Sequence, residues 1–173
     1  MGNLATPQAL LHRWDEVLRD PSLQDLPYKI ELNAWGKVEM SPASVRHGQL
    51  QAALAAAFSD QLRDGITITE CPVLTTIGIR VPDLAWASVQ FMRQHGRSSP
   101  LPRAPEICVE VLSPSNVTAE IEEKTRAYLA AGAREVWLVA EDGGLRILDS
   151  SGERAASGFP IRVALPDPTK GYP

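Results

Sequence analysis

The pattern of apolar and polar positions along the 173-residue chain predicts a mixture of helices and strands. Apolar residues recur at helical spacing from Pro7 to a stop at Asp20-Pro21, and again over residues 44–62. A third helix is expected from a cap at Asn116 or Thr118 to a glycine cap at Gly132. Strand patterns, which alternate or run continuously apolar, cover residues 28–32, 37–40, 66–70, 73–76, 77–87, 106–112, 136–140 and 145–148.

The order of these elements predicts an α/β fold. The nearly continuous apolar run over residues 106–112 indicates a strand in the middle of a sheet. The helix that follows and the strand at 136–140 complete a parallel crossover unit. Residues 91–105, rich in Pro, Ser and Arg, are expected to form a loop. The length fits one domain, with an N-terminal helical extension (1–27), a core (28–149) and a C-terminal edge or tail (150–173).

Composition narrows the functional classes. Apolar content of 44% and charged content of 22% are those of an ordinary globular protein. A net charge of −4 argues against an extensive nucleic-acid footprint, although an enzyme that touches a short stretch of backbone stays open. Cys71 and Cys108 lack a zinc-ligand spacing, so we interpret them as small buried hydrophobes in a reducing compartment. No apolar run approaches the ~20 residues of a membrane span, and a soluble, cytoplasmic protein is expected.

Two acidic residues interrupt apolar strand patterns. Asp83 lies in VPDLAWAS, and Glu110 lies in EICVEVLSPS. A buried carboxylate without a partner would give up its charge, whereas a divalent cation keeps two carboxylates ionised together. The alternative is that either acid sits at a strand end, in water or paired with an arginine.

Lys124 is the third candidate. At ~100° per residue it lies ~60° from Ile121, on the edge of the apolar stripe of its helix, so its ammonium is able to reach the sheet. The alternative is a surface pair with Glu120. Two carboxylates and a lysine suit phosphodiester hydrolysis, in which the acids hold Mg²⁺ or Mn²⁺ and the lysine orients water or stabilises developing charge.

Other candidates are weaker. The 91–105 segment carries Arg93, Arg97 and Arg103, which either meet a phosphate backbone near the metal or belong to an ordinary solvated loop. His47 lies on the apolar stripe of its helix, where a lone histidine is more often a core residue than a catalyst. Glu31, Glu39 and Glu70 each follow or join apolar strand residues, and each is a candidate for a further metal ligand or a supporting acid.

Several segments, taken in order, resemble the Uma2 (DUF820) family of the PD-(D/E)xK nuclease superfamily. They are IELNAWGKVEMSPASVRHGQL, TECPVLT, IRVPDLAWAS, EICVEVLSPSN and IEEKTRAYLAAGAREVWLV, from about residue 30 to residue 139.

The resemblance implies a restriction-endonuclease-like core, a central mixed sheet flanked by helices, with Asp83 and Glu110 as its two acids. The superfamily often places a lysine two residues after the second acid, where this chain has Leu112. Lys124 matches a lysine that substitutes from the following helix. Glu31 and His47 match positions that recur in the N-terminal segment of this family, so the resemblance implies that they are auxiliary site residues.

The resulting hypothesis is a Mg²⁺-dependent (or Mn²⁺-dependent) DNA endonuclease with Asp83, Glu110 and Lys124 as its catalytic residues. A homodimer is expected, because cutting both strands with one site per chain favours two-fold symmetry. Two alternatives stay open: a nuclease fold kept as a binding or regulatory module without turnover, and a metal-independent hydrolase that uses two carboxylates, as glycosidases do.

Overall fold

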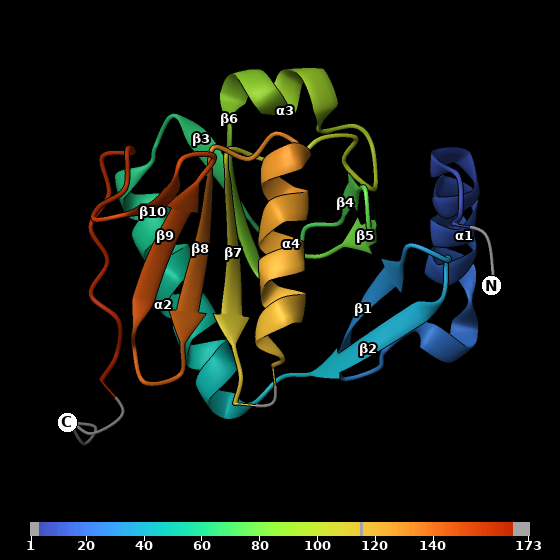
Figure 1. The fold of residues 1–173 in the computed structure, drawn as a ribbon, viewed down its shortest axis with the longest axis horizontal. Helices are drawn as coiled ribbons and strands as arrows, with labels where there is room; N and C mark the ends of the chain where they lie inside the picture. Colours follow the sequence, from blue (N-terminus) through green and yellow to red (C-terminus); the bar gives the residue numbers. More distant parts are fainter. Residues whose placement is uncertain (1–3, 115, 168–173) are drawn as a thin grey trace.

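The computed structural model describes residues 4–114 and 116–167, which form a six-stranded sheet and a four-stranded sheet (Figure 1). The larger sheet has the strand order β10-β9-β8-β7-β6-β3. Its strands, in chain order, are β3 (Gly65–Thr69), β6 (Leu84–Ser88), β7 (Ile107–Leu112), β8 (Glu135–Ala140), β9 (Leu145–Asp149) and β10 (Gly152–Arg154).

The larger sheet is mixed, as predicted. Strands β7 and β8 pair in parallel, and helix α4 (Thr118–Ala130) connects them; the other pairs in this sheet are antiparallel. Helix α4 covers one face of the sheet and α2 (Val45–Gln61) covers the other (Figure 1). The α/β fold with a parallel crossover is therefore confirmed.

The two faces of β7 differ in character. Ile107, Val109 and Val111 point into an apolar core with Leu54 and Phe58 of α2. On the opposite face, Cys108 packs in a second core beneath α4, together with Cys71, Ile121 and Tyr128. Both cysteines are buried and free, in agreement with the sequence interpretation. Glu110 lies on this second face, which therefore combines apolar packing with charge.

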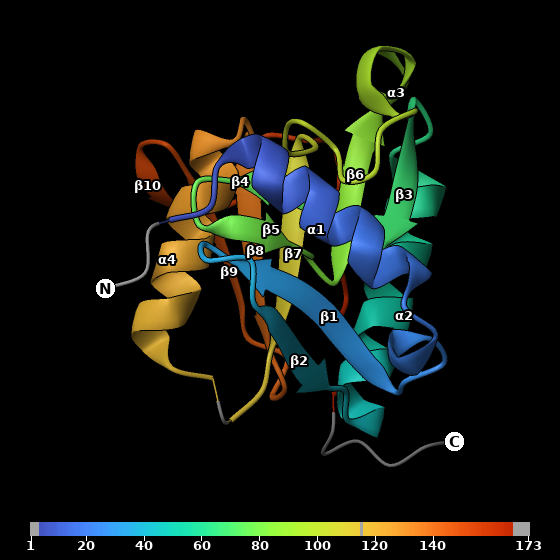
Figure 2. The same ribbon diagram turned by 90° about the vertical axis from the view of Figure 1, so that its right-hand side faces the viewer.

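The smaller sheet is antiparallel, with the order β2-β1-β5-β4. Helix α1 (Pro7–Arg19), capped by Thr6, lies across it (Figure 2) and packs Leu10 and Trp14 against the apolar side of β1. Leu11 and Leu18, on the same helix, are exposed. A short 3₁₀ turn (Pro21–Leu23) leads from α1 into β1. The strands of this smaller sheet are β1 (Tyr28–Asn33), β2 (Val38–Pro42), β4 (Val73–Thr75) and β5 (Gly78–Arg80).

Gly78 permits the close pairing of β5 with β1. Its φ of +118° lies outside the range that side chains favour, and a Cβ there would lie 2.0 Å from the Leu32 carbonyl oxygen.

The single strand predicted over residues 77–87 is wrong. The chain forms β5 in the smaller sheet and β6 in the larger one, and Val81, Pro82 and Asp83 lie between them. Pro82 has no backbone N–H to donate to a ladder, which favours a break at this point. Asp83 therefore lies just before a strand rather than within one.

Two smaller predictions are also corrected. Residues 91–105 are not entirely loop, because α3 (Val89–His95) occupies the first part, with the Ser88 hydroxyl accepting from the Phe91 N–H as its cap. The N-cap of α4 is Val117, which makes no side-chain cap, rather than Asn116 or Thr118.

The predicted division at residues 28 and 149 stays a prediction, and residues 1–3 and 168–173 lie outside the described part of the chain. Of the helices in the described part, none combines the length and apolar character that a membrane crossing requires.

Candidate active site

The two predicted acids meet where the smaller sheet adjoins the larger one. Strands β6 and β7 are antiparallel, with Leu84 opposite Val109, so the register brings Asp83 next to Glu110. Both carboxylates are almost fully buried, with 1% and 4% of each residue exposed. They line a cavity of about 280 Å³ together with Lys29, His47 and Lys124. The structure therefore brings the two acids together, and their role as site residues stays a prediction.

In each acid, one carboxylate oxygen accepts a hydrogen bond from a neutral protein group, and the other oxygen contacts an ammonium. The Val111 N–H donates to Oδ2 of Asp83 at 2.7 Å, and the Tyr128 hydroxyl donates to Oε1 of Glu110 at 2.7 Å. The remaining oxygens converge on one ammonium, with Lys29 Nζ 2.7 Å from Asp83 Oδ1 and 3.2 Å from Glu110 Oε2. Two carboxylate oxygens on separate elements therefore share one cationic group.

Lys124 reaches the same cluster from α4. Its Nζ lies 2.7 Å from Glu31 Oε2 and 3.8 Å from Glu110 Oε1, and the residue is 5% exposed. The inward orientation of the Lys124 side chain, predicted from helical phase, is confirmed. The alternative of a surface ion pair between Lys124 and Glu120 is wrong.

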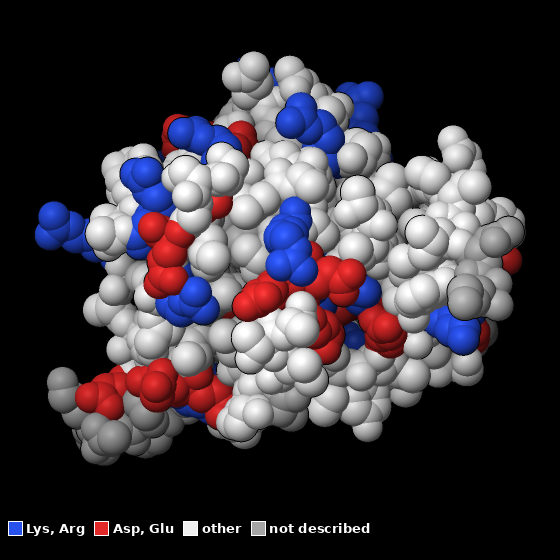
Figure 3. Space-filling view, viewed as in Figure 1, with Lys and Arg blue, Asp and Glu red and all other residues white. Residues whose placement is uncertain are grey.

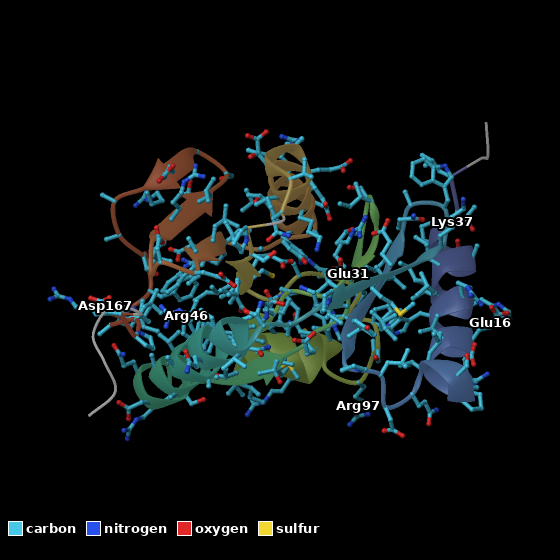
Figure 4. The ribbon with its side chains drawn as sticks, turned by 90° about the horizontal axis from the view of Figure 1, so that it is seen from below. Glu16, Glu31, Lys37, Arg46, Arg97 and Asp167 are labelled. Carbon is cyan, nitrogen blue, oxygen red and sulfur yellow. The ribbon has the colours of Figure 1, made fainter. Side chains whose placement is uncertain are left out.

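Glu31 fixes Lys124 to the smaller sheet. Its other oxygen, Oε1, accepts a 2.7 Å hydrogen bond from the Val81 N–H, and Arg80 lies 3.5 Å from Oε2. Figure 4 shows Glu31 at the centre of the molecule, on the β1 side of the junction between the sheets. This auxiliary residue is therefore part of the cluster. Glu39 lies further out, where it binds Arg80 at 2.6 Å.

His47 and Glu70 form another wall of the cavity. Near the start of α2, His47 Nε2 lies 3.4 Å from Asp83 Oδ1. Gln51, one turn on, donates to both Glu70 Oε1 and the Asp83 carbonyl oxygen. Glu70 has a φ of +48°, an uncommon conformation for a residue other than glycine and one that clusters at functional sites. The sequence interpretation of His47 as a core residue is wrong, because it lines the cavity.

The ionisation of the cluster follows from burial and charge together. Burial raises the pKa of Glu110, with the charges of Lys29 and Lys124 opposing this effect. Burial also disfavours the charge of Asp83, but its hydrogen bond to His47 and the charge of Lys29 prevail and lower its pKa. Although burial favours neutral amines, the neighbouring carboxylates raise the pKa of both lysines. The two lysines therefore remain ammoniums at neutral pH.

Sequence reasoning missed Lys29 and Tyr128. On β1, Lys29, Glu31 and Asn33 alternate with Ile30 and Leu32, which pack toward α1. This period-2 pattern was the available signal that β1 has a second, polar face. Tyr128 lies four residues after Lys124 in α4, so both side chains lie on neighbouring parts of one helix face.

The predicted contribution of the arginine-bearing segment is not found. Helix α3 begins at the end of β6 opposite to Asp83, a separation of roughly 16 Å for a five-residue strand. Figure 4 shows Arg97 at the periphery, away from Glu31. Arg93, Arg97 and Arg103 do not line the cavity.

The oxygen donors fit a small divalent cation. Mg²⁺ prefers oxygen ligands and is commonly held by one or two carboxylates, with water and substrate oxygens completing its shell. Asp83 Oδ1 and Glu110 Oε2 already converge on a cation, the ammonium of Lys29. Among residues 4–114 and 116–167 no group of three or more His, Cys, Asp or Glu side chains is arranged as a metal site. A divalent cation here would therefore take its carboxylate ligands from these two acids, with other oxygens completing its shell.

The surface near the cavity is acidic. Acidic side chains gather around the lower half of α4 and toward the β1–β2 hairpin in Figure 3. Helix α4 contributes Glu120, Glu122 and Glu123, all exposed, and Glu120 also lines the cavity. Such a surface attracts cations and repels a phosphate backbone.

Comparisons with known proteins agree with the fold. Residues 14–151 match the family described as "Uma2: Putative restriction endonuclease". The fold is similar to the crystal structure of "a putative nuclease belonging to DUF820" from Anabaena variabilis ATCC 29413, with a TM-score of 0.61 and 17% sequence identity over 78% of each chain. At this identity the similarity concerns the fold alone. No curated protein matches the chain.

Proposed function

The chain belongs to the Uma2 family, and we propose that it is a metal-dependent DNA endonuclease that hydrolyses phosphodiester bonds by direct attack of water. The family description supports nuclease chemistry, and the DNA substrate and the metal requirement are our proposals. One observation carries them. Asp83 and Glu110 each have one oxygen anchored by the protein, and their other oxygens converge on a single cation position.

In this proposal Asp83 and Glu110 hold Mg²⁺ or Mn²⁺. When bound, such an ion supplies Lewis-acid charge that favours ionisation of water and offsets negative charge on the phosphate. The Val111 N–H and Tyr128 hydroxyl fix the orientation of the two acids, so that the carboxylates themselves need little reorientation on binding.

The other residues act on the substrate side. Lys124, held by Glu31, brings a positive charge to the cavity, where it stabilises the charge that develops on the phosphoryl oxygens. His47 approaches the same oxygen of Asp83, Oδ1, that Lys29 contacts. Because the outer surface is acidic, phosphate binding at this cavity depends on the charges of Lys29, of Lys124 and of the cation.

A plasmid-cleavage assay tests the proposal. Supercoiled DNA is incubated with the protein in Mg²⁺, in Mn²⁺ and in EDTA, and nicked and linear products are quantified. Cleavage is expected with either metal and is expected to stop in EDTA. Asp83→Asn is expected to abolish it, whereas Glu123→Gln, on the exposed side of α4, serves as the matched acid-to-amide control and is expected to retain it.

A non-catalytic binding or regulatory module is the second candidate. It is favoured by the pairing of both acids with lysines of the same chain, which satisfies their charges internally. If the protein binds DNA in the presence of metal but does not cleave it, that result would support this candidate. Cleavage that persists in EDTA would instead indicate the metal-independent two-carboxylate hydrolase.

A further inference from the structure

Lys29 occupies a different position from Lys124. Lys29 Nζ bonds to Asp83 Oδ1, which His47 Nε2 also approaches, and to Glu110 Oε2. Lys124 instead bonds to Glu31 and approaches the oxygen of Glu110 that Tyr128 already fixes. A cation that used the convergent oxygens would meet Lys29 directly. Two positive charges a few ångströms apart in a buried site repel strongly, so Lys29 and a divalent ion cannot both occupy this position.

The charge count strengthens this conflict. Among the described residues, the four acids and three bases of this ion-paired cluster sum to one negative charge, so a divalent ion would leave one positive charge in excess while Lys29 stayed in place. The paired groups are the acids Glu31, Glu39, Asp83 and Glu110 and the bases Lys29, Arg80 and Lys124.

Lys29 also has room to move. Its side chain is 12% exposed, against 7% for Lys124, and it lies near the start of β1. The cavity beside it is walled by Pro27, Tyr28 and Pro42 of the β1–β2 hairpin region. A lysine carries its charge on a flexible four-carbon stem, so a rotamer change can carry the ammonium from the acids into the cavity, where a substrate phosphate would lie.

We propose that Lys29 is a displaceable counter-ion: its ammonium holds Asp83 and Glu110 together, and a divalent cation binds by displacing it toward the phosphate. This inference rests on the proposed function, because it takes the acids as the metal ligands. It makes the affinity of the free protein for metal low and couples metal binding to the arrival of a phosphate that receives the lysine.

Calorimetric titration of MnCl₂ into the protein without DNA tests the displacement. Lys29→Met removes the competing charge while keeping an apolar stem, and Lys37→Met makes the same change on the exposed β1–β2 turn, outside the cavity lining. Glu110→Gln reports binding that does not use the site. Lys29→Met is expected to bind Mn²⁺ about tenfold more tightly than wild type or more, and Lys37→Met is expected to match wild type.

If Lys29→Met binds Mn²⁺ no more tightly than wild type, and the binding still depends on Glu110, the displacement is overturned while the proposed metal site stands. Loss of Glu110-dependent binding from both wild type and Lys29→Met overturns the displacement and the proposed metal dependence together.

A second measurement uses wild type alone and decides the case even if Lys29→Met does not fold. Lysines are acetylated with and without saturating Mn²⁺, and the modified peptides are quantified by mass spectrometry. Acetylation of Lys29 is expected to rise severalfold with Mn²⁺, while the exposed Lys37 stays constant as an internal reference. Unchanged Lys29 acetylation at saturating Mn²⁺ would refute the displacement.

Discussion

The two faces of strand β7 show how one short segment serves stability on one side and chemistry on the other. Toward α2, Ile107, Val109 and Val111 enter an apolar core. Toward α4, Glu110 enters a cluster of paired charges with Lys29 and Lys124. The apolar face stabilises the fold by removing hydrocarbon from water. The charged face gains little net stability, because desolvation of buried ions offsets most of their attraction.

This difference assigns separate consequences to mutation on each face. Changes on the α2 side are expected to alter the free energy of unfolding and to leave the chemistry of the folded protein intact. Changes on the α4 side are expected to alter cleavage and metal binding more than stability.

The largest expected effect is that of Glu110→Gln on cleavage. The amide keeps the size of the side chain but removes the charge that would hold a cation, so cleavage is expected to fall by at least ~10³-fold, about 4 kcal/mol of transition-state stabilisation. Both lysines keep a partner, Lys29 in Asp83 and Lys124 in Glu31, so thermal unfolding is expected to shift little. Plasmid cleavage and a melting curve measure the two effects. Full cleavage by this variant would remove Glu110 from the chemistry.

The second effect, on the opposite face, is that of Leu54→Ala. Leu54 is completely buried against β7, and its truncation leaves a cavity that costs about 2–5 kcal/mol of unfolding free energy. Chemical denaturation measures this loss, and cleavage per folded molecule is expected to stay at the wild-type rate. A loss of cleavage without a loss of stability would mean that the two faces are not separable.

Third comes Lys124→Met, which removes the charge from α4 and leaves an apolar stem. We expect cleavage to fall by about 10²-fold, in line with the loss of one preorganised charge near a developing oxyanion. Lys37→Met, a change of the same kind on an exposed turn, is the control. Should both variants cleave equally, Lys124 would be a structural partner of Glu31 rather than a participant.

The same two faces indicate how much of the fold the sequence predicts. The apolar run over residues 106–112 predicts a strand, whose period-2 geometry places Val109 and Glu110 on opposite faces, because strand periodicity is a local property of the chain. The break at Pro82 was missed because apolar residues continue through it, and only pairing with distant strands divides the segment between two sheets. Local patterns therefore predicted the elements, and tertiary pairing decided where one of them ended.

The site shows a similar limit. Asp83 and Glu110 were found because each is a polar exception on an apolar segment, and Lys124 was found from its helical phase. Lys29 was missed because a lysine on a hairpin strand is ordinarily solvated, and nothing local indicates that β1 will pack its polar face against the ends of β6 and β7. Its burial comes from contacts with residues 54 and 81 positions away.

The smallest expected effect tests the anchoring of the charged face. Tyr128 is fully buried and donates to Glu110 Oε1 at 2.7 Å, so Tyr128→Phe removes one hydrogen bond to a charged group and keeps the ring. A loss of about 1–2 kcal/mol in unfolding free energy is expected. Cleavage is expected to fall less than in Lys124→Met, because Glu110 keeps its charge and loses only part of its orientation. Thr125→Val, which removes the buried Thr125 hydroxyl bonded to the Ile121 carbonyl oxygen, is the control for losing a buried hydroxyl on the same helix. If Tyr128→Phe lowers stability as expected but leaves the affinity for Mn²⁺ and the rate of cleavage unchanged, the tyrosine belongs to the packing of α4 and the orientation of Glu110 is set by its lysines alone.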